Sequence, residues 1–194
     1  MMNIEKQKLV ADSVLKKIET VDPTAIIAGG APRDWHFGNL ASDIDVFFCF
    51  NREDLQPYYI TDLLENGLGF KNVGRIQVDH FTDENGRDKK NENVLHVYNY
   101  LEKDVKIQFI VTKNPTWGLL ETFPLNISRA WYKRGQIELT REFMWTEKHN
   151  AIVKMSDLYM NGDKYVEKIR NKFPNFNYFV NEEEFRKHIV NKYL

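Results

Sequence analysis

The sequence predicts an α+β (α/β) fold, in which a mixed β-sheet is flanked by helices and followed by a small C-terminal helical cap. Apolar residues recur at helical spacing from Ile4 to Thr20. A strand, a glycine turn, a short helix and a second strand follow between Ala25 and Phe50. Two alternating runs, Val94 to Leu101 and Asp104 to Thr112, then have the pattern of a β-hairpin.

Composition limits the class of protein before any motif is considered. A chain of 194 residues allows one domain, or one domain with a small appendage, and 42% hydrophobic residues can form a real core. The net charge of −1 provides no global basic field, so a nucleic-acid partner would need a local patch. The single cysteine, Cys49, cannot form an internal disulfide. We see no signal peptide and no apolar run of membrane-spanning length, and therefore expect a cytoplasmic protein without a membrane partner.

The segment from Ala25 to Phe50 carries the most functional information. Its first apolar run leads into Gly29 and Gly30, which have no Cβ, so an anionic ligand can approach the backbone at the start of the next helix. Pro32 suits the first turn of that helix, because its missing N–H would have no helical partner there. Arg33 adds a planar guanidinium suited to phosphate oxygens. The sequence therefore predicts a phosphate site at this turn.

Two carboxylates follow on the next predicted strand. Asp43 and Asp45 are two positions apart, so their side chains leave the same face, while Ile44 and Val46 point into the core. Neighbouring carboxylates repel each other, and an unpaired one among apolar residues is costly. Mg²⁺ (or Mn²⁺) would relieve this, because it binds carboxylates together with substrate phosphates. Taken singly, the glycines could be an ordinary turn and Asp43 a capping residue, but this leaves Asp45 unexplained.

The order of these residues resembles a known signature. Gly29-Gly30-x-x-Arg33-Asp34 followed by Asp43-x-Asp45 resembles the motif of the polymerase-β-like nucleotidyltransferase superfamily. It is most similar to the head of the tRNA nucleotidyltransferases, of the CCA-adding and poly(A) polymerase types, whose motif reads GGxxRD and then DxD. The proline after the glycines and the small size look more like short nucleotidyltransferase-like proteins of bacteriophages. The resemblance implies that Asp34 organises the loop or contacts the nucleotide.

The superfamily usually takes a third carboxylate from a strand in the position of the second hairpin strand. By alternation, that position in this chain is Gln108. Glutamine can orient a metal-bound water or a hydroxyl, but it supplies no negative charge. Asp104 or Asp79 could substitute from a neighbouring position, and Gln108 could alternatively be only a surface-strand residue.

A second, weaker resemblance lies further along the chain. The run from Thr122 to Ser128 is similar to the DFTINA segment of tRNA nucleotidyltransferases, with Thr122 in place of the aspartate and Asn126 retained. It implies that Asn126 contacts the sugar or the triphosphate of a nucleotide. We expect this run within a helix from Thr116 to Tyr132 that is interrupted near Pro124.

The remaining pattern predicts a domain of residues 1–145 and a helical extension of residues 146–194. The extension mixes basic and aromatic residues, which could form a face for RNA or substrate but is more simply a cap on the sheet. The other expected elements are a helix from Asn51 to Leu64, a strand from Phe70 to His80, an exposed loop from Phe81 to Asn93, a short strand from Gln136 to Thr140, and helices from Met155 to Lys172 and Glu182 to Tyr193.

The sequence and the resemblance together predict a metal-dependent nucleotidyltransferase. It would transfer a nucleoside monophosphate from a nucleoside triphosphate (NTP) to an acceptor hydroxyl and release pyrophosphate. The acceptor could be an RNA 3′ end, a protein or a small molecule; CCA addition is not expected, because the segment after Thr146 is short. The expected residues are Asp43 and Asp45 for catalysis and metal binding, and Gly29, Gly30, Arg33, Asp34 and Asn126 for nucleotide binding. The alternative is a catalytically weakened relative that binds nucleotide, RNA or a protein partner. A purely structural protein would leave the carboxylate pair unexplained.

Overall fold

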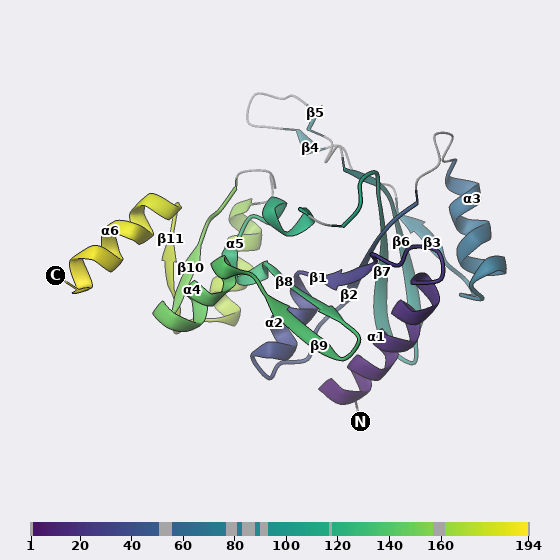
Figure 1. Cartoon of the computed structure of the whole chain (residues 1–194), viewed down its shortest axis with the longest axis horizontal. Coiled ribbons are helices and arrows are strands. Elements are labelled where there is room, and N and C mark those ends of the chain that lie inside the picture. Colours follow the sequence, from purple (N-terminus) through teal and green to yellow (C-terminus); the bar gives the residue numbers. More distant parts are fainter. Residues whose placement is uncertain are drawn as a thin grey trace.

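A computed structural model describes residues 2–50, 56–76, 81–82, 88–89, 93–116, 118–156 and 162–193 of the chain. Its centre is a mixed sheet with the strand order β3-β6-β7-β2-β1-β8-β9 (Figure 1). The strands β2 and β7 run parallel, and the other neighbouring pairs run antiparallel. The strands of this sheet are β1 (Ile26–Ala28), β2 (Ile44–Cys49), β3 (Gly74–Ile76), β6 (Val94–Glu102), β7 (Val105–Thr112), β8 (Ala130–Lys133) and β9 (Gln136–Leu139).

Helices surround this sheet, which confirms the predicted α+β architecture. No helix among the described residues is both long and apolar enough to cross a membrane. The α-helices are α1 (Ile4–Ile18), α2 (Gly30–His36), α3 (Pro57–Asp62), α4 (Arg141–His149), α5 (Gly162–Lys172) and α6 (Glu182–Tyr193). Shorter helical turns are η1 (Leu63–Gly67), which continues α3 as a π-helix, and the 3₁₀ turns η2 (Leu119–Thr122) and η3 (Asn126–Ser128).

The main core lies between α1 and one face of the sheet. Asn3 caps α1 by accepting a hydrogen bond from the backbone N–H of Lys6 (2.9 Å), and the helix buries an apolar stripe. Ile44, Val46 and Phe48 of β2 belong to the same buried cluster. Because side chains alternate along a strand, Asp45 points to the opposite face of the sheet. The predicted helix and the predicted alternation of β2 are both confirmed.

The β6–β7 hairpin is confirmed as well. Lys103 and Asp104 form its turn with positive φ values of 49° and 66°, the geometry that matches the twist of the flanking strands. The final helix and the strand β9 also form where the sequence predicts them. The helix expected from Asn51 begins instead at Pro57, because Gln56 has an extended backbone (φ −79°, ψ 143°) and forms the N-cap; residues 51–55 lie outside the described residues.

The structure corrects two expected helices. The run from Thr116 to Tyr132 forms two 3₁₀ turns and then β8, which pairs with β1 and β9. Tertiary strand pairing therefore overrides the helical spacing, and the aromatic residues of β8 suit a strand. The second expected helix is described from Gly162, and Met155 and Ser156 are not helical; residues 157–161 lie outside the described residues.

Two other expectations are met only in part. The strand expected from Phe70 to His80 is present as β3, and residues 77–80 lie outside the described residues. Within the expected loop from Phe81 to Asn93, the short strands β4 (Phe81–Thr82) and β5 (Asp88–Lys89) pair with each other. The other residues of that run up to 92 lie outside the described residues.

The C-terminal segment is a mixed unit rather than a purely helical one. Its strands β10 (Ala151–Val153) and β11 (Asn177–Phe179) pair in parallel, beside α4, α5 and α6 (Figure 1). The helix α4 crosses the expected boundary between residues 145 and 146. One buried apolar cluster, which we call the junction core, joins the two parts; it contains Leu125, Ile127, Ala130, Phe143, Ile152, Ile169 and Phe173. The division into two units stays a prediction.

Candidate active site

The glycine turn connects β1 to α2 in a backbone conformation that favours glycine. Gly29 has φ 82° and ψ −117°, and its N–H donates to the carbonyl of Ala130 in β8 (3.1 Å). A Cβ at Gly29 would lie 3.4 Å from the ring of Phe123. At Gly30, a Cβ would lie 3.7 Å from Nη2 of Arg33, so the guanidinium folds back over the turn.

The short helix α2 is fixed from the side of the main core. Trp35 donates from its indole N–H to Oε1 of Gln7 in α1 (2.9 Å), and its ring meets that of Tyr132 edge-on at 5.1 Å. The backbone N–H of Ala41 donates to the same Gln7 oxygen (3.0 Å). These contacts orient α2, and therefore the charged residues on its other side.

Arg33 is buried and held on several sides. Only 4% of the residue is exposed. Nε donates to Oδ1 of Asp34 (2.9 Å), and Nη1 donates to the hydroxyls of Ser128 (3.3 Å) and Tyr165 (3.4 Å). Burial lowers the pKa of Arg33, but Tyr165 and Asp34 outweigh it, and the net effect raises the pKa. The guanidinium therefore keeps its charge in a fixed position beside the glycine turn.

Asp34 connects α2 to the C-terminal segment. Asp34 is only 2% exposed, and the two oxygens of its carboxylate have different partners. Oδ1 accepts from Arg33, and Oδ2 accepts from the ammonium of Lys172 in α5 (2.6 Å). In this arrangement Asp34 organises the site; direct contact with a nucleotide stays a prediction.

The Asp45 carboxylate lies within electrostatic reach of the Asp43 carboxylate and of two cations. Both residues are half-buried, and Ser42 donates its hydroxyl to Oδ1 of Asp43 (3.2 Å). Burial, and then the charge of Asp43, raise the pKa of Asp45 to about 7. Arg33 and Lys168 act in the opposite direction. The predicted phosphate-binding arginine, the carboxylate pair and α5 therefore share one electrostatic environment, in which a bound cation would stabilise ionised Asp45.

Gln108 occupies the strand position beside Asp45. The parallel register of β2 and β7 pairs these two residues, and the antiparallel register of β6 and β7 pairs Gln108 with Asn99. Nε2 of Gln108 donates to Oδ1 of Asn99 (3.2 Å). Asp104 lies in the hairpin turn, and Asp79 lies outside the described residues. The position opposite Asp45 is therefore an amide, as the alternation predicts.

The donor set fits a weakly held hard cation. Among the described residues, no group of three or more His, Cys, Asp or Glu side chains could hold a metal ion. Two carboxylates and an amide oxygen are nevertheless ligand types that Mg²⁺ accepts, and Mg²⁺ commonly retains water and substrate oxygens as further ligands. Asp43, Asp45 and Gln108 are the residues that could hold it.

The side chain of Asn126 makes its hydrogen bonds to α4 and β10 rather than to the glycine turn. It is fully buried, and Nδ2 donates to the carbonyl oxygens of Glu142 (3.1 Å) and Ala151 (3.2 Å) and to the hydroxyl of Thr146 (3.0 Å). Its Oδ1 accepts from the backbone N–H of Val153 (2.7 Å). These bonds attach η3 to α4 and β10, and it is Ser128 at the other end of η3 that accepts from Arg33. Nucleotide contact by Asn126 stays a prediction that would require the bonds to open.

Sequence reasoning offered the basic and aromatic residues of the C-terminal segment as a possible substrate face, but it did not connect α5 with the glycine turn. Tyr165, Lys168 and Lys172 are spaced at successive helical turns, which is the one signal in the sequence that they share a face. Tyr165 is 132 residues from its partner Arg33, and Lys172 is 138 residues from its partner Asp34, so local pattern could not reveal these contacts.

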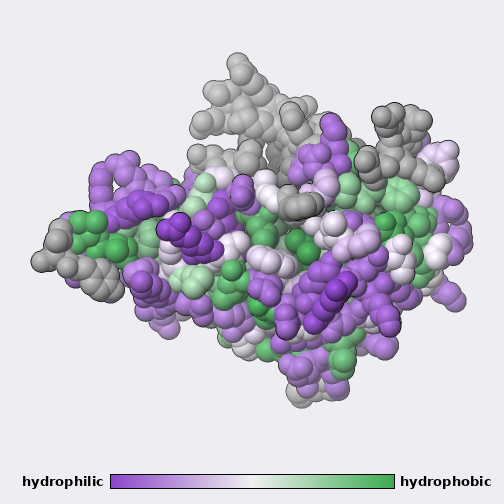
Figure 2. All heavy atoms as spheres, viewed as in Figure 1, coloured by the Kyte–Doolittle hydropathy of each residue, from purple (hydrophilic) through white to green (hydrophobic). Residues whose placement is uncertain are grey.

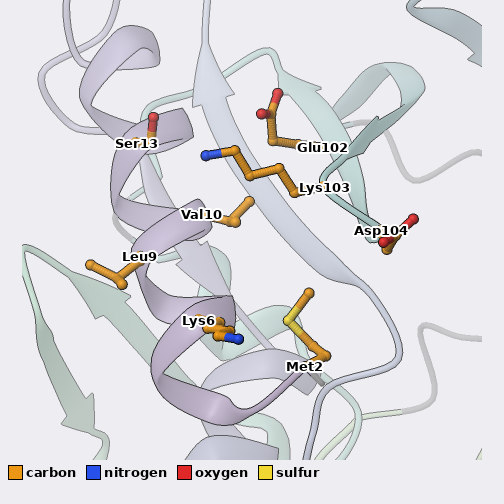
Figure 3. A pocket seen from close by; sticks show the side chains of 8 residues that line it. All are labelled: Met2, Lys6, Leu9, Val10, Ser13, Glu102, Lys103 and Asp104. Atoms are coloured by element: carbon orange, nitrogen blue, oxygen red, sulfur yellow. The ribbon is translucent and has the colours of Figure 1, made fainter.

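A separate pocket of about 370 Å³ lies between α1 and the β6–β7 turn and shares no residue with the site (Figure 3). Met2, Lys6, Leu9, Val10 and Ser13 line it from the N-terminal side, and Glu102, Lys103 and Asp104 line it from the hairpin. Because α1 packs on the sheet face opposite Asp45, this pocket is not part of the candidate site.

The comparisons with known proteins concern the fold. No protein-family model matches the sequence, and no curated protein sequence matches it. Similar solved structures include the Thermotoga maritima CCA-adding enzyme complexed with tRNA_CCA (TM-score 0.58, 15% identity) and a CCA-adding enzyme in complex with ATP (TM-score 0.60, 15% identity). A tRNA nucleotidyltransferase complexed with a primer tRNA and an incoming ATP analog gives a TM-score of 0.51 at 17% identity.

The likeness covers most of this chain but less than half of those proteins. It covers 96% of this chain and 42% of each CCA-adding enzyme, and 86% of this chain and 46% of the tRNA nucleotidyltransferase. At this identity the shared feature is the arrangement of the backbone. Over the matched part, the chain therefore shares its fold with the CCA-adding enzymes and the tRNA nucleotidyltransferase.

Proposed function

We propose that this protein is a metal-dependent nucleotidyltransferase, which transfers a nucleoside monophosphate from an NTP to an acceptor hydroxyl. One observation carries the proposal: a buried, charged Arg33 beside a glycine turn shares its electrostatic environment with the Asp43 and Asp45 carboxylates. An anion site next to a carboxylate pair combines the two elements that phosphoryl chemistry requires. The shared fold with a CCA-adding enzyme in complex with ATP adds support for an NTP as donor.

The residues of this chain would act mainly by positioning the NTP. The turn at Gly29 and Gly30 lets phosphate oxygens approach the backbone, and Arg33 donates from the turn side of its guanidinium. Asp34 holds that guanidinium in place. Asp43 and Asp45 would hold Mg²⁺ or Mn²⁺, which supplies positive charge next to the reacting phosphate when bound. Gln108 could orient a water or the acceptor hydroxyl.

The transfer itself is an in-line displacement at the α-phosphorus. The acceptor oxygen forms a bond to this phosphorus, the bond to the leaving pyrophosphate breaks, and the hydroxyl proton passes to water. The acceptor could be an RNA 3′ end, a protein or a small molecule. The chain spans less than half of the CCA-adding enzymes that it resembles, so tRNA as acceptor is not part of the proposal.

A label-transfer assay tests the proposal. The purified chain is incubated with each of the four NTPs labelled at the α-phosphate, with Mg²⁺ or Mn²⁺, and with RNA, protein and small-molecule acceptors. We expect labelled acceptor with the wild-type chain and none with Asp45→Ala, while circular dichroism shows the same fold for both. Full transfer by Asp45→Ala would contradict the assignment of the site.

The second candidate is a catalytically weakened relative that binds its ligand without transfer. It is favoured by one observation, the neutral pair Gln108 and Asn99 in place of a third carboxylate. Calorimetry with NTPs, with and without Mg²⁺, separates the two candidates when combined with the transfer assay. Metal-dependent nucleotide binding without transfer to any acceptor would favour this second candidate.

A further inference from the structure

The helix α5 presents one face to the candidate site. Tyr165 contacts Arg33 and Ser128 through its hydroxyl, and Lys172 pairs with Asp34 two turns later. Between them, Ile169 is fully buried in the junction core. Three residues at helical spacing therefore fix which side of α5 faces α2.

Lys168 lies on the same side of the helix. It is three positions after Tyr165 and four before Lys172, so its side chain leaves α5 between theirs. Its charge acts on the Asp45 carboxylate, which places the ammonium within electrostatic reach of the carboxylate pair. Lys168 is exposed, and among the described residues it has no ion-pair partner. Its ammonium is therefore available to a ligand.

The charges around the turn explain why a further cation matters there. Arg33 is bound to Asp34, so much of its charge is already offset inside the protein. Lys172 is bound to the other oxygen of Asp34. A polyphosphate that approached Asp43 and Asp45 would meet two carboxylates, and repulsion would oppose its binding. Among the cations of α5, Lys168 is the one whose side chain leaves the helix between those of Tyr165 and Lys172, so it is placed to offset this repulsion.

We propose that α5 forms a wall of the nucleotide site, that Lys168 binds the polyphosphate of the NTP, and that Lys172 is a positioning residue that holds α5 against α2. The inference rests on the proposed function, because it assumes an NTP at the glycine turn. It adds a binding residue from the C-terminal segment, which the GGxxRD and DxD motifs do not contain.

The first test measures binding of inorganic tripolyphosphate by calorimetry in EDTA, so that no divalent metal contributes. Lys168→Met removes the charge and keeps a chain of similar length. Lys187→Met is the matched control, because Lys187 is an exposed lysine of α6 whose ion-pair partner within the described part of the chain is Glu183 (2.6 Å). Loss of a charge-assisted contact to phosphate predicts binding weaker by about tenfold or more for Lys168→Met, and by less than about twofold for the control.

The outcomes separate this inference from the proposed function. Wild-type binding that Lys168→Met leaves unchanged overturns the role of Lys168 and leaves the proposed function standing. A wild-type chain that binds neither tripolyphosphate in EDTA nor ATP in the presence of Mg²⁺ overturns both. Acylation of surface lysines followed by mass spectrometry gives an independent measurement on the unaltered protein. Tripolyphosphate should protect Lys168 and leave Lys187 reactive; equal reactivity of Lys168 with and without the ligand contradicts the inference.

The positioning role of Lys172 is tested by conservative rescue. Lys172→Met removes the partner of Asp34 and should weaken tripolyphosphate binding, because α5 and Lys168 lose their attachment to α2. Lys172→Arg retains a cation for Asp34 and should restore most of that binding. If both variants fold and bind like the wild type, Lys172 does not position the site.

Discussion

Replacing Asp45 by asparagine should stabilise the metal-free protein above neutral pH. Burial and the charge of Asp43 raise the pKa of Asp45 from 3.8 to about 7, so the fold disfavours the ionised carboxylate. Between these two values the folded chain binds more protons than the unfolded chain, and wild-type stability falls as pH rises through this window. Above pH 7 the loss is complete. The asparagine side chain has the same shape without the charge and avoids the loss.

The magnitude follows from the two pKa values. At about 1.4 kcal/mol for each pKa unit, the rise from 3.8 to about 7 corresponds to at most about 4 kcal/mol at pH 8. At pH 5 the same linkage gives only about 2 kcal/mol, because most of the window lies above that pH. If the asparagine side chain makes fewer hydrogen bonds than the carboxylate, this cost is the same at pH 5 and at pH 8. The pH-dependent part of the difference between the two proteins therefore measures the charge of Asp45.

Urea denaturation followed by tryptophan fluorescence in EDTA gives these free energies of unfolding at pH 5 and pH 8. We expect Asp45→Asn to gain about 3 kcal/mol relative to wild type between the two pH values, because about two pKa units of the window lie above pH 5. A constant difference, or one that changes in the opposite sense, would refute the reasoning about burial. Adding Mg²⁺ at pH 8 should stabilise the wild type and leave Asp45→Asn unchanged, which tests the metal assignment separately.

Three further substitutions test other parts of the site. Gly29→Ala should lower the melting temperature more than Gly38→Ala and should weaken NTP binding. Both glycines have positive φ, but of the two only Gly29 has a neighbour, Phe123, within 4 Å of the added Cβ. Equal melting temperatures of the two variants would contradict this. Gln108→Asp should tighten Mn²⁺ binding, measured by electron paramagnetic resonance, and should lower the free energy of unfolding in EDTA, since it adds a carboxylate beside Asp45. Asn126→Ala should lower the free energy of unfolding by about 2 kcal/mol or more through the loss of four buried hydrogen bonds. If Asn126→Ala instead lowers NTP affinity at unchanged stability, the nucleotide contact implied by the sequence is favoured.

Local pattern was sufficient to predict the part of the site that lies close together in sequence. The alternation of β2 separates Asp45 from Ile44 and Val46, and the glycine turn follows from residues adjacent to it. Alternation also predicts which face of β7 carries Gln108, whereas its place beside Asp45 was implied by the family resemblance and agrees with the observed register. These features depend on the geometry of residues that are close together in the sequence, so the local pattern of residue types is enough to predict them.

Long-range contacts account for what the sequence did not predict. Tyr165 and Lys172 reach α2 from more than a hundred residues away, and no local pattern identifies their partners. The run before Lys133 has helical spacing, yet β8 forms because it pairs with two strands at once. Asn126 looked like a ligand contact because its type matches a family motif, but its amide bonds are made to α4 and β10.

The junction core has a practical consequence for expression of shorter pieces of this protein. Leu125 and Ile127 precede the expected boundary at residue 145, but part of the apolar surface around them comes from Ile152, Ile169 and Phe173. A fragment that stops at residue 145 would expose Leu125 and Ile127 to water, and exposed apolar patches of this kind favour self-association. Figure 2 shows further apolar side chains at the end of the molecule that carries α6, where Val180 and Val190 are exposed. The C-terminal segment should therefore be kept in any shortened version intended to stay monomeric in solution.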